Sequence, residues 1–346
     1  MERGSKKGIR RRCLGAALAL CLCVAFFLVC CDKEAKEEEK KAVRIGVSLY
    51  RGDDTFINNI RTELEREAKL YEQELGIKIQ LDIMDAKGSQ NTQNIQIERF
   101  LSLGCDVLCV NPVDRTNASV IIDMAMQEEV PVIFFNRQPV EEDMDRWSDL
   151  YYLGVQAKES AVLQGSMVVD LYQEHPEELD RNQDGVVSYV LLEGENSHQD
   201  ALIRTEWSVQ TLKDKGVPIE KLTGGIANWE RSQASALMEQ WLNEYPNQIE
   251  LVISNNDDMA LGALDAMERA GIQTIQVVGI DGTTSGLEAV ESGRMLGTVS
   301  SDKEQYAKAM LEIALHRVLG RELSEDIELE DGKYYQCPQK IVKKID

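Results

Sequence analysis

Short apolar runs alternate with longer amphipathic segments from residue 42 to residue 319. Short runs rich in β-branched residues are typical of buried strands, whereas apolar positions three or four residues apart indicate helices. The short runs predict strands over 43–50, 77–84, 106–111, 130–136, 151–155, 186–193, 217–224, 249–254, 275–280 and 296–300. The amphipathic segments predict helices over 55–75, 89–103, 115–129, 157–173, 200–215, 231–244, 257–270, 285–292 and 303–319.

The alternation forms one series up to residue 136 and restarts after residue 150. Continuous apolar strands separated by helices favour parallel sheets that are covered by helices on both faces. A chain of 346 residues also exceeds the length that one hydrophobic core usually serves. The predicted fold class is therefore α/β, with two doubly wound parallel-sheet lobes.

The N-terminus has the pattern of an export signal. Six basic residues within the first 12 precede an apolar run over 13–29. The run ends in Leu-Val-Cys-Cys, which resembles the lipobox of bacterial lipoproteins, and Cys31 suits lipidation better than Cys30 because Leu28 then stands three residues before it. An uncleaved membrane anchor is the alternative. Both interpretations place the body of the protein outside the cytoplasm, and we take residues 1–30 as the signal peptide.

Charge excludes one class of partner. The chain has a formal net charge of −22 and its first 30 residues carry +5, which leaves −27 for the exported part. Residues 32–41 are nearly all charged, so 31–42 are expected to form a solvated tether between membrane and body. A surface this acidic repels phosphate backbones, so a nucleic-acid partner is not expected.

Cysteine spacing argues against a disulfide-stabilised fold. Only Cys105, Cys109 and Cys337 of the eight cysteines lie beyond residue 31. Cys105 and Cys109 are four residues apart on a predicted strand, which separates them by about 13 Å, too far for a disulfide. We interpret them as small core residues, since no histidine or further cysteine is nearby in the sequence to support a metal or redox role.

Polar side chains directly follow several of the predicted strands. Ligands of open parallel sheets bind beyond the carboxyl ends of the strands, so these residues are expected to meet in one cleft. A single Asp or Thr in such a loop is often a helix N-cap instead, and this alternative applies to Asp257 and Thr283. The strand-end residues are Asp53, Asp54, Thr55, Phe56, Asn136, Arg137, Asn255, Asn256, Asp257 and Asp281.

The segment DRNQDGVVS, residues 180–188, has the spacing of a calcium-binding loop. Oxygen-bearing side chains stand at its first, third, fifth and ninth positions, and Gly185 takes the sixth. The twelfth position of an EF-hand would hold a glutamate, but this chain has Leu191 there, and a strand follows the loop. The segment is therefore not an EF-hand. It is either a calcium loop completed by a distant carboxylate or a solvated turn.

Several motifs together resemble the periplasmic galactose/glucose-binding proteins, the substrate-binding subunits of ABC-type sugar importers. The motifs are IGVSLYRGDDTF, VPVIFFNRQP, GENSHQDALIRTEW, NNDDMALGA, VVGIDG and the calcium-like loop. They follow one another in order from about residue 43 to the C-terminus. The resemblance implies two lobes, 43–154 with 301–336 and 155–300 with 337–346, joined by three chain crossings that form a hinge.

Carried over by position, the resemblance implies a sugar site in the cleft between the lobes. Its residues would be Asp54, Phe56, Asn136, His198, Asp200, Arg204, Trp229, Asn256, Asp281 and Ser301. Two aromatic side chains would cover the apolar faces of a pyranose, while carboxylates accept from its hydroxyls and the other polar groups donate. Ser301 departs from the family, which has an asparagine at this position. A packing role for Phe56, or a surface ion pair of Asp200 with Arg204, is the alternative for those residues.

The resemblance also implies that the loop binds a calcium ion. Its ligands would be Asp180, Asn182, Asp184, the Val186 carbonyl, Ser188 and the distant Glu250. Ser188 stands where the family has a longer amide side chain.

The expected function is the capture of D-galactose or D-glucose outside the cytoplasm and its delivery to an ABC permease. The alternative is a sensory module of the same fold that presents the sugar to a chemoreceptor or histidine kinase. An enzyme is not expected. His198, Asp200 and Glu195 could be read as acid–base groups of a glycosidase, but the chain has no G-x-S-x-G, H-E-x-x-H or phosphate-loop motif.

Overall fold

The computed structural model describes residues 42–344, which contain two six-stranded sheets. In the first sheet the strand order is β11-β5-β4-β3-β1-β2, and all neighbouring strands are parallel. Its strands are β1 (Ala42–Leu49), β2 (Lys78–Asp85), β3 (Val107–Val110), β4 (Val132–Phe135), β5 (Leu150–Gly154) and β11 (Tyr334–Gln336).

The second sheet has the order β12-β10-β9-β8-β6-β7. Five of its strands are parallel, and β12 pairs antiparallel with β10. Its strands are β6 (Val187–Glu193), β7 (Ile219–Ile226), β8 (Leu251–Ser254), β9 (Gln276–Asp281), β10 (Gly297–Ser301) and β12 (Gln339–Lys343). The predicted fold class is confirmed, and the antiparallel β12 is an addition that the sequence analysis did not foresee.

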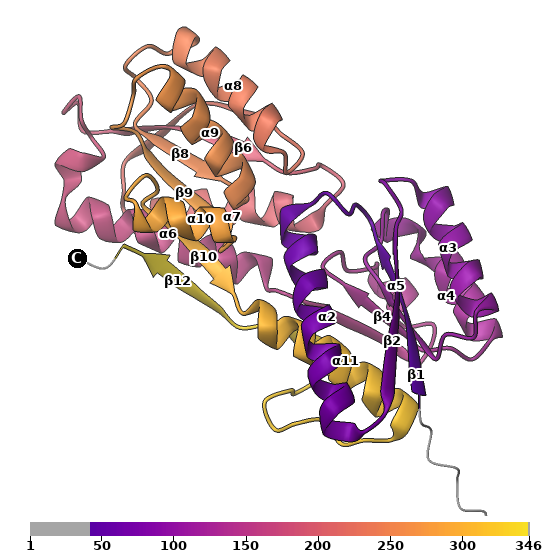
Figure 1. The fold of residues 1–346 in the computed structure, drawn as a ribbon. Coiled ribbons are helices and arrows are strands. Elements are labelled where there is room, and N and C mark those ends of the chain that lie inside the picture. Colours follow the sequence, from indigo (N-terminus) through magenta and orange to yellow (C-terminus); the bar gives the residue numbers. More distant parts are fainter. Residues whose placement is uncertain (1–41, 345–346) are drawn as a thin grey trace, which may run out of the picture. The chain divides into compact units, whose positions relative to one another are not determined.

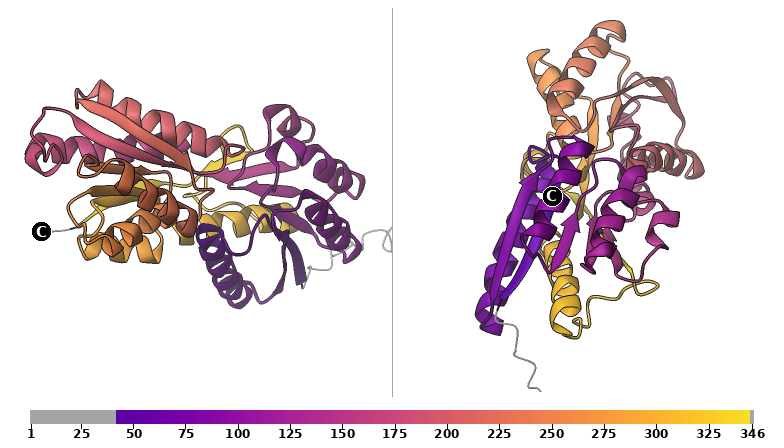
Figure 2. Two further views of the ribbon diagram at one scale, coloured as in Figure 1. Left: turned by 90° about the horizontal axis from the view of Figure 1, so that it is seen from above. Right: turned by 90° about the vertical axis from the view of Figure 1, so that its right-hand side faces the viewer.

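Helices cover both faces of each sheet (Figures 1 and 2). Around the first sheet lie α2 (Thr55–Leu75), α3 (Gln90–Ser102), α4 (Ala118–Gln127), the short α5 (Glu141–Met144) and α11 (Lys303–Leu319). Around the second lie α6 (Ala157–Glu174), α7 (Gln199–Asp214), α8 (Arg231–Glu244), α9 (Asp257–Arg269) and α10 (Thr284–Glu291). Two 3-10 turns, η1 (Arg115–Asn117) and η2 (Pro176–Glu178), complete the described elements.

Each sheet has a separate hydrophobic core on each of its two faces. Ile60 of α2 and Met310 of α11 are buried against β1 on one face of the first sheet, and Phe100 of α3 and Ile121 of α4 on the other. The second sheet is covered in the same way by α8 and α9 on one face and by α6 and α7 on the other. Strands enclosed on both faces must be apolar throughout, which explains their continuous apolar sequence.

The chain passes between the two sheets three times. It leaves the first sheet after β5, returns after β10 through α11, which packs against α2, and crosses again between β11 and β12. Figure 1 shows α11 alongside α2, although the two helices are more than 200 residues apart in the sequence. Ser301, which we assigned to the N-terminal lobe, is the last residue of β10 and pairs with Gln339 in the second sheet.

The predicted signal peptide and the lipidation candidate Cys31 lie outside the described residues, as does the predicted tether except for its last residue. Among residues 42–344, no helix is both long and apolar enough to cross a bilayer. Cys105, Cys109 and Cys337 are buried free thiols in this part of the chain.

Candidate functional site

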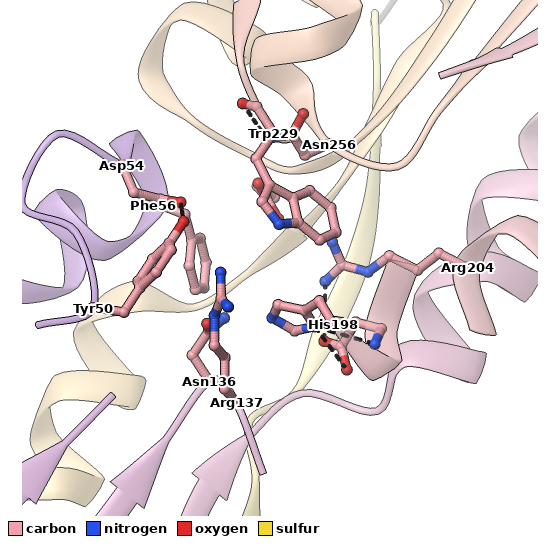
Figure 3. Close-up of a pocket in the computed structure, with 11 residues that line it drawn as sticks. Tyr50, Asp54, Phe56, Asn136, Arg137, His198, Arg204, Trp229 and Asn256 are labelled. Atoms are coloured by element: carbon pink, nitrogen blue, oxygen red, sulfur yellow. Dashed lines mark hydrogen bonds and ion pairs between the residues drawn. The ribbon is translucent and has the colours of Figure 1, made fainter. Parts of the chain in front are cut away.

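A polar pocket lies where the carboxyl ends of strands from both sheets face each other (Figure 3). The residues lining it that follow strands of the first sheet are Tyr50, Asp54, Phe56, Asn136 and Arg137. Those that follow strands of the second sheet are His198, Asp200, Arg204, Trp229, Asn256 and Asp281. Nine of the ten residues expected at a sugar site therefore line one pocket.

Ser301 is the exception, because it does not line this pocket. It lies with Asp302, Lys303 and Lys340 beside a separate groove. The Ser301 side chain is buried, and its hydroxyl has no hydrogen-bond partner among the described residues. A contact of Ser301 with a bound sugar therefore stays a prediction that the pocket lining does not include.

Two lining residues, Tyr50 and Arg137, were not among the residues that the family resemblance implied for the sugar site. Arg137 directly follows Asn136 at the end of β4, and the strand-end rule did select it for the cleft. Tyr50 follows β1 without interruption, so in the sequence it is indistinguishable from an aromatic core residue.

Three of the pocket residues also begin a helix. Asp54 accepts a hydrogen bond from the Ile57 amide (3.0 Å) at the start of α2, and Asn256 accepts from the Met259 amide (2.9 Å) at the start of α9. His198 is the N-cap of α7. The N-cap role and the pocket role are therefore held by the same residues, and each cap fixes the orientation of a polar side chain.

A buried charge cluster occupies the wall from the second sheet. Nη2 of Arg204 is 3.7 Å from an oxygen of Asp200, and its Nη1 is 3.5 Å from an oxygen of Asp281. All three side chains are at least nine-tenths buried, so Asp200 and Arg204 are not a surface pair. Burial raises the pKa of Asp200 and raises that of Asp281 well above the usual carboxyl range, while Arg204 opposes both shifts.

His198 presents a hydrogen-bond donor to the pocket. Its Nδ1 accepts from the Asp200 backbone amide at 3.2 Å, so the ring proton of the neutral form resides on Nε2. Burial, and then the positive charge of Arg137 and Arg204, lowers the pKa of His198 well below its usual value. The imidazole is therefore neutral at pH 7, with an N–H available to a ligand oxygen.

Two large aromatic side chains project into the pocket from opposite sheets, Phe56 and Trp229 (Figure 3). The indole of Trp229 packs edge-on against His198, with ring centroids 5.2 Å apart. Gly194 makes this position possible, because a Cβ there would lie 2.2 Å from the indole.

Three residues that line this pocket have an unfavourable backbone conformation. Asn136 (φ 62°), Trp229 (φ 68°) and Asp281 (φ 118°) all have positive φ, which is uncommon for residues other than glycine and unusual for a bulky tryptophan. Such conformations cost free energy and persist where the surrounding structure enforces them, often at ligand sites.

Arg137 links the two sides of the pocket. Its guanidinium lies 3.8 Å from the centre of the Tyr50 ring, and its Nη2 is 2.9 Å from Glu195, which follows β6 in the second sheet. The Tyr50 hydroxyl in turn donates to Asp54. One chain of interactions thus connects an acceptor on the first sheet to the loop after β6.

Several buried donors at the pocket have no hydrogen-bond partner among residues 42–344. They are Nε of Arg137, Nε of Arg204 and the indole Nε1 of Trp229. A buried N–H without a partner costs about 1–3 kcal/mol, so these groups favour a ligand that offers oxygen acceptors.

The calcium-like loop precedes β6, on the second sheet. Oxygens of Asp180, Asn182 and Asp184 accept backbone N–H groups of the same loop at 2.8–3.1 Å. Glu250 is buried and accepts from the amides of Asn182 (3.2 Å) and Ser188 (3.0 Å), as well as from Arg181. The structure therefore places the distant glutamate against the loop.

The fit of a metal ion to this loop is partial. Carboxylate and amide oxygens are the donors that calcium prefers. However, no group of three or more His, Cys, Asp or Glu side chains in residues 42–344 is spaced to hold a metal ion. In this arrangement the expected ligand oxygens stabilise the loop backbone.

Residues 45–322 match the family described as periplasmic binding protein domain. The chain is 35% identical over 288 residues, 83% of its length and 85% of the relative's, to the D-galactose/methyl-galactoside binding periplasmic protein MglB of Haemophilus influenzae. It is 27% identical over 313 residues to the xylitol-binding protein of Mycolicibacterium smegmatis, covering 90% of this chain and 82% of that one. Among solved structures, an ABC transporter solute binding protein of Bacillus halodurans with bound myo-inositol superposes with a TM-score of 0.71 at 28% identity, covering 89% and 96% of the two chains.

The chain belongs to the periplasmic binding protein family. Its relatives are solute-binding proteins rather than enzymes, and family membership places its binding body outside the cytoplasm. The acid–base interpretation of His198, Asp200 and Glu195 as a glycosidase is therefore not supported.

Proposed function

We propose that this protein captures one monosaccharide in the pocket between its two sheets and delivers it to an ABC permease, with D-galactose or D-glucose as the expected ligand. The observation that carries the proposal is the pocket lining, in which two aromatic side chains are combined with carboxylates and orphaned N–H donors. The apolar faces of a sugar ring would pack against the aromatic side chains. Its hydroxyls, which both donate and accept, would bind the carboxylates and the N–H donors.

The relatives support a small ligand with many hydroxyl groups. The relatives named above bind a galactoside, xylitol and myo-inositol, all small polyhydroxylated molecules. The galactoside-binding relative has the highest identity of the three, which favours a hexose.

Recognition would depend on charge-assisted hydrogen bonds. The carboxyl groups of Asp54, Asp200 and Asp281 provide acceptor oxygens, and a hydrogen bond that involves a charged group contributes about 1.5–3 kcal/mol. Arg204 and the Nε2–H of His198 provide donors. A sugar that lacks one of the matching hydroxyls leaves a buried partner unpaired, which gives selectivity among epimers.

Transport would depend on a conformational equilibrium. The pocket is lined from both sheets, so a bound sugar stabilises the arrangement in which the two sheets face each other closely. A permease that recognises this arrangement then receives loaded protein in preference to empty protein. The names of the relatives describe binding and transport, which is why we propose a permease rather than a sensory receptor as the partner.

Two further parts of the proposal come from the sequence. We propose that lipidated Cys31 holds the body at the membrane, and replacement by serine would then release the protein into the soluble fraction. We also propose that the loop 180–188 binds calcium, with the contacts of Glu250 to that loop in support.

Isothermal titration calorimetry of the body, residues 42–346, tests the sugar proposal. The titrants are D-galactose, D-glucose, methyl-β-D-galactoside, D-ribose, D-xylose and myo-inositol. We expect one site with D-galactose or D-glucose as the tightest ligand. Tighter binding of a pentose or of inositol would overturn the hexose assignment, and no heat with any titrant at millimolar concentration would overturn the sugar proposal itself.

A further inference from the structure

Two buried tyrosines hold the peptide groups of a residue that lines the pocket. Tyr306, on α11, accepts a hydrogen bond from the Asn136 amide at 3.0 Å and donates to the Leu153 carbonyl at 2.8 Å. Tyr152, on β5, donates to the Asn136 carbonyl at 3.1 Å. Both tyrosines are 1% exposed, so neither is positioned to contact a ligand directly.

Asn136 needs this support because its backbone is left-handed. Its φ of 62° is tolerated by asparagine better than by most residues but is still unfavourable. The Asn136 amide also donates to the Leu153 carbonyl at 3.0 Å. The Tyr306 hydroxyl is thus a second acceptor for the Asn136 N–H, and it donates to the Leu153 carbonyl as well. The two hydroxyls therefore anchor both peptide groups that flank the Asn136 side chain.

The side chain of Asn136 is oriented by a third buried residue. Nδ2 of Asn111 donates to Oδ1 of Asn136 at 3.3 Å, and Asn111 is completely buried. With its carbonyl oxygen engaged on that side, Asn136 presents its NH₂ group to the pocket. A rotation of the supporting peptide would move that donor away from the ligand position.

Tyr306 contacts a second pocket residue through its ring. The rings of Tyr306 and Phe56 form an edge-to-face pair, with centroids 6.2 Å apart and planes at 89°. Figure 3 shows that Phe56 and Asn136 are both directed into the pocket from the side of the first sheet. One tyrosine, on the helix that follows the second chain crossing, thus supports an aromatic surface and a polar donor together.

Tyr152 reaches Asn136 only because a glycine leaves space for it. A Cβ on Gly154 would lie 2.0 Å from the Tyr152 hydroxyl. Replacing Gly154 by any other residue would displace the hydroxyl, so the two positions act as a unit in supporting the Asn136 peptide.

We propose that Tyr306 is a positioning residue for ligand recognition, which acts through Asn136 and Phe56 without touching the ligand, and that Tyr152 supports the same peptide. This inference rests on the proposed sugar-binding function. It assigns a role in the binding site to a residue that lies 170 positions from Asn136 in the sequence and belongs to the segment that returns from the second sheet.

The test compares Tyr306→Phe with Tyr335→Phe, measured by calorimetry with the tightest sugar of the panel above. Tyr335 is also buried, and its hydroxyl contacts Gln305 away from the pocket, so it controls for the loss of a buried hydroxyl. We expect Tyr306→Phe to weaken binding about 5-fold, the equivalent of about 1 kcal/mol, and Tyr335→Phe to weaken it less than 2-fold. Melting temperatures of both variants separate affinity from stability.

A double-mutant cycle with Asn136→Ala identifies the route of the effect. If Tyr306 acts mainly through Asn136, Tyr306→Phe should weaken binding less than 2-fold once Asn136 is already alanine. Equal affinity of Tyr306→Phe and wild type, or an equal loss in Tyr335→Phe, would overturn the inference. If Asn136→Ala binds too weakly to measure, the comparison of the two tyrosine variants decides alone, and Tyr152→Phe serves if Tyr306→Phe does not fold.

Failure of the inference can be distinguished from failure of the proposed function. Wild-type protein that binds no sugar contradicts the function, whereas wild-type protein that binds sugar no more tightly than Tyr306→Phe contradicts only the inference.

Discussion

Asp257 is a buried carboxylate directly beneath the loop that carries Asp281. It accepts hydrogen bonds from the Thr298 hydroxyl (2.6 Å) and the Thr283 amide (2.8 Å). Burial raises its pKa to about 6, against the opposing effect of those hydrogen bonds and of Lys303. The N-cap of α9 is Asn256 and not Asp257, so the expected N-cap alternative is wrong for Asp257. It is confirmed for Thr283, which caps α10.

The raised pKa of Asp257 predicts a pH-dependent stability. Because the folded-state pKa exceeds the unfolded value, the contribution of this carboxyl to the free energy of unfolding is complete below about pH 4 and is lost as the pH rises through about 6. When the pH is lowered from 7.5 to 5, the free energy of unfolding of the wild type should rise by about 1 kcal/mol more than that of Asp257→Asn. Urea unfolding at both pH values measures the difference.

Asp265→Asn is the matched control for this experiment. Asp265 forms an ion pair with Arg231 at 2.6 Å, which lowers its pKa, so its contribution is lost only at more acidic pH. Its substitution should leave the change between pH 7.5 and pH 5 as in the wild type. An identical pH dependence in wild type and Asp257→Asn would contradict the assignment of the raised pKa to Asp257.

Single residues differ in how much of their role the sequence reveals. Asp54, Asn136 and Asn256 lie in the short loops after apolar strands, so their place in the cleft could be predicted from strand polarity. Tyr50 and Tyr306 could not be recognised, because an aromatic residue beside an apolar run has the sequence pattern of the core. The hydroxyl contacts of Tyr306 also depend on residues that are distant in the chain.

At the scale of elements, the loop before β6 gives a prediction about calcium. If the loop binds the ion, calcium should raise the melting temperature of the protein above its value in EGTA, because a ligand that binds only the folded state stabilises it. Glu250→Gln should remove most of this difference, since it replaces the buried carboxylate that contacts the loop from the residue before β8.

Asp184→Asn provides a second variant, in the middle of the loop itself, and magnesium is the control ion. Calcium should raise the melting temperature more than magnesium, which requires closer and more regular coordination. A wild-type melting temperature that is the same in calcium and in EGTA would count against a calcium site and in favour of a loop held by its own hydrogen bonds.

Sequence periodicity predicted the central strands of both sheets but not the C-terminal edge strands β11 and β12. The central strands β3, β4 and β8 have continuous apolar sequences, because both of their faces are buried. The edge strand β12, with the sequence QKIVK, is only partly buried and pairs antiparallel with β10. Its existence depends on the final chain crossing, which apolar periodicity does not specify.

At the scale of the whole binding body, several contacts join the two sides of the cleft. Arg51 pairs with Glu230 at 3.0 Å, and the Thr55 hydroxyl donates to Asp258 at 2.5 Å. Arg137 pairs with Glu195 at the pocket itself. Such contacts favour the closed arrangement independently of the ligand, so they should raise the apparent affinity for sugar.

Glu230→Gln tests this contribution without altering the pocket lining. The Arg51–Glu230 pair is partly exposed, so its loss should weaken sugar binding by no more than about 5-fold at low salt. The difference from wild type should decrease at 0.5 M NaCl, because salt screens exposed charges. Calorimetry at both salt concentrations measures the effect.

Asp265→Asn again supplies the control, because it breaks an ion pair of similar exposure that lies within one side of the cleft. That variant should bind sugar as the wild type does. Equal affinity of Glu230→Gln and wild type at low salt would show that this contact does not influence closure.

The sequence by itself determined the class of fold and the polar residues at the strand ends, because burial on two faces and strand polarity are local properties that each segment records. It could not determine which residues support the cleft from behind, or that Ser301 lies outside it. Those features arise where α11 and β12 return after crossing between the sheets. Contacts between segments more than 100 residues apart are fixed by tertiary packing, which has no periodic signature in the chain.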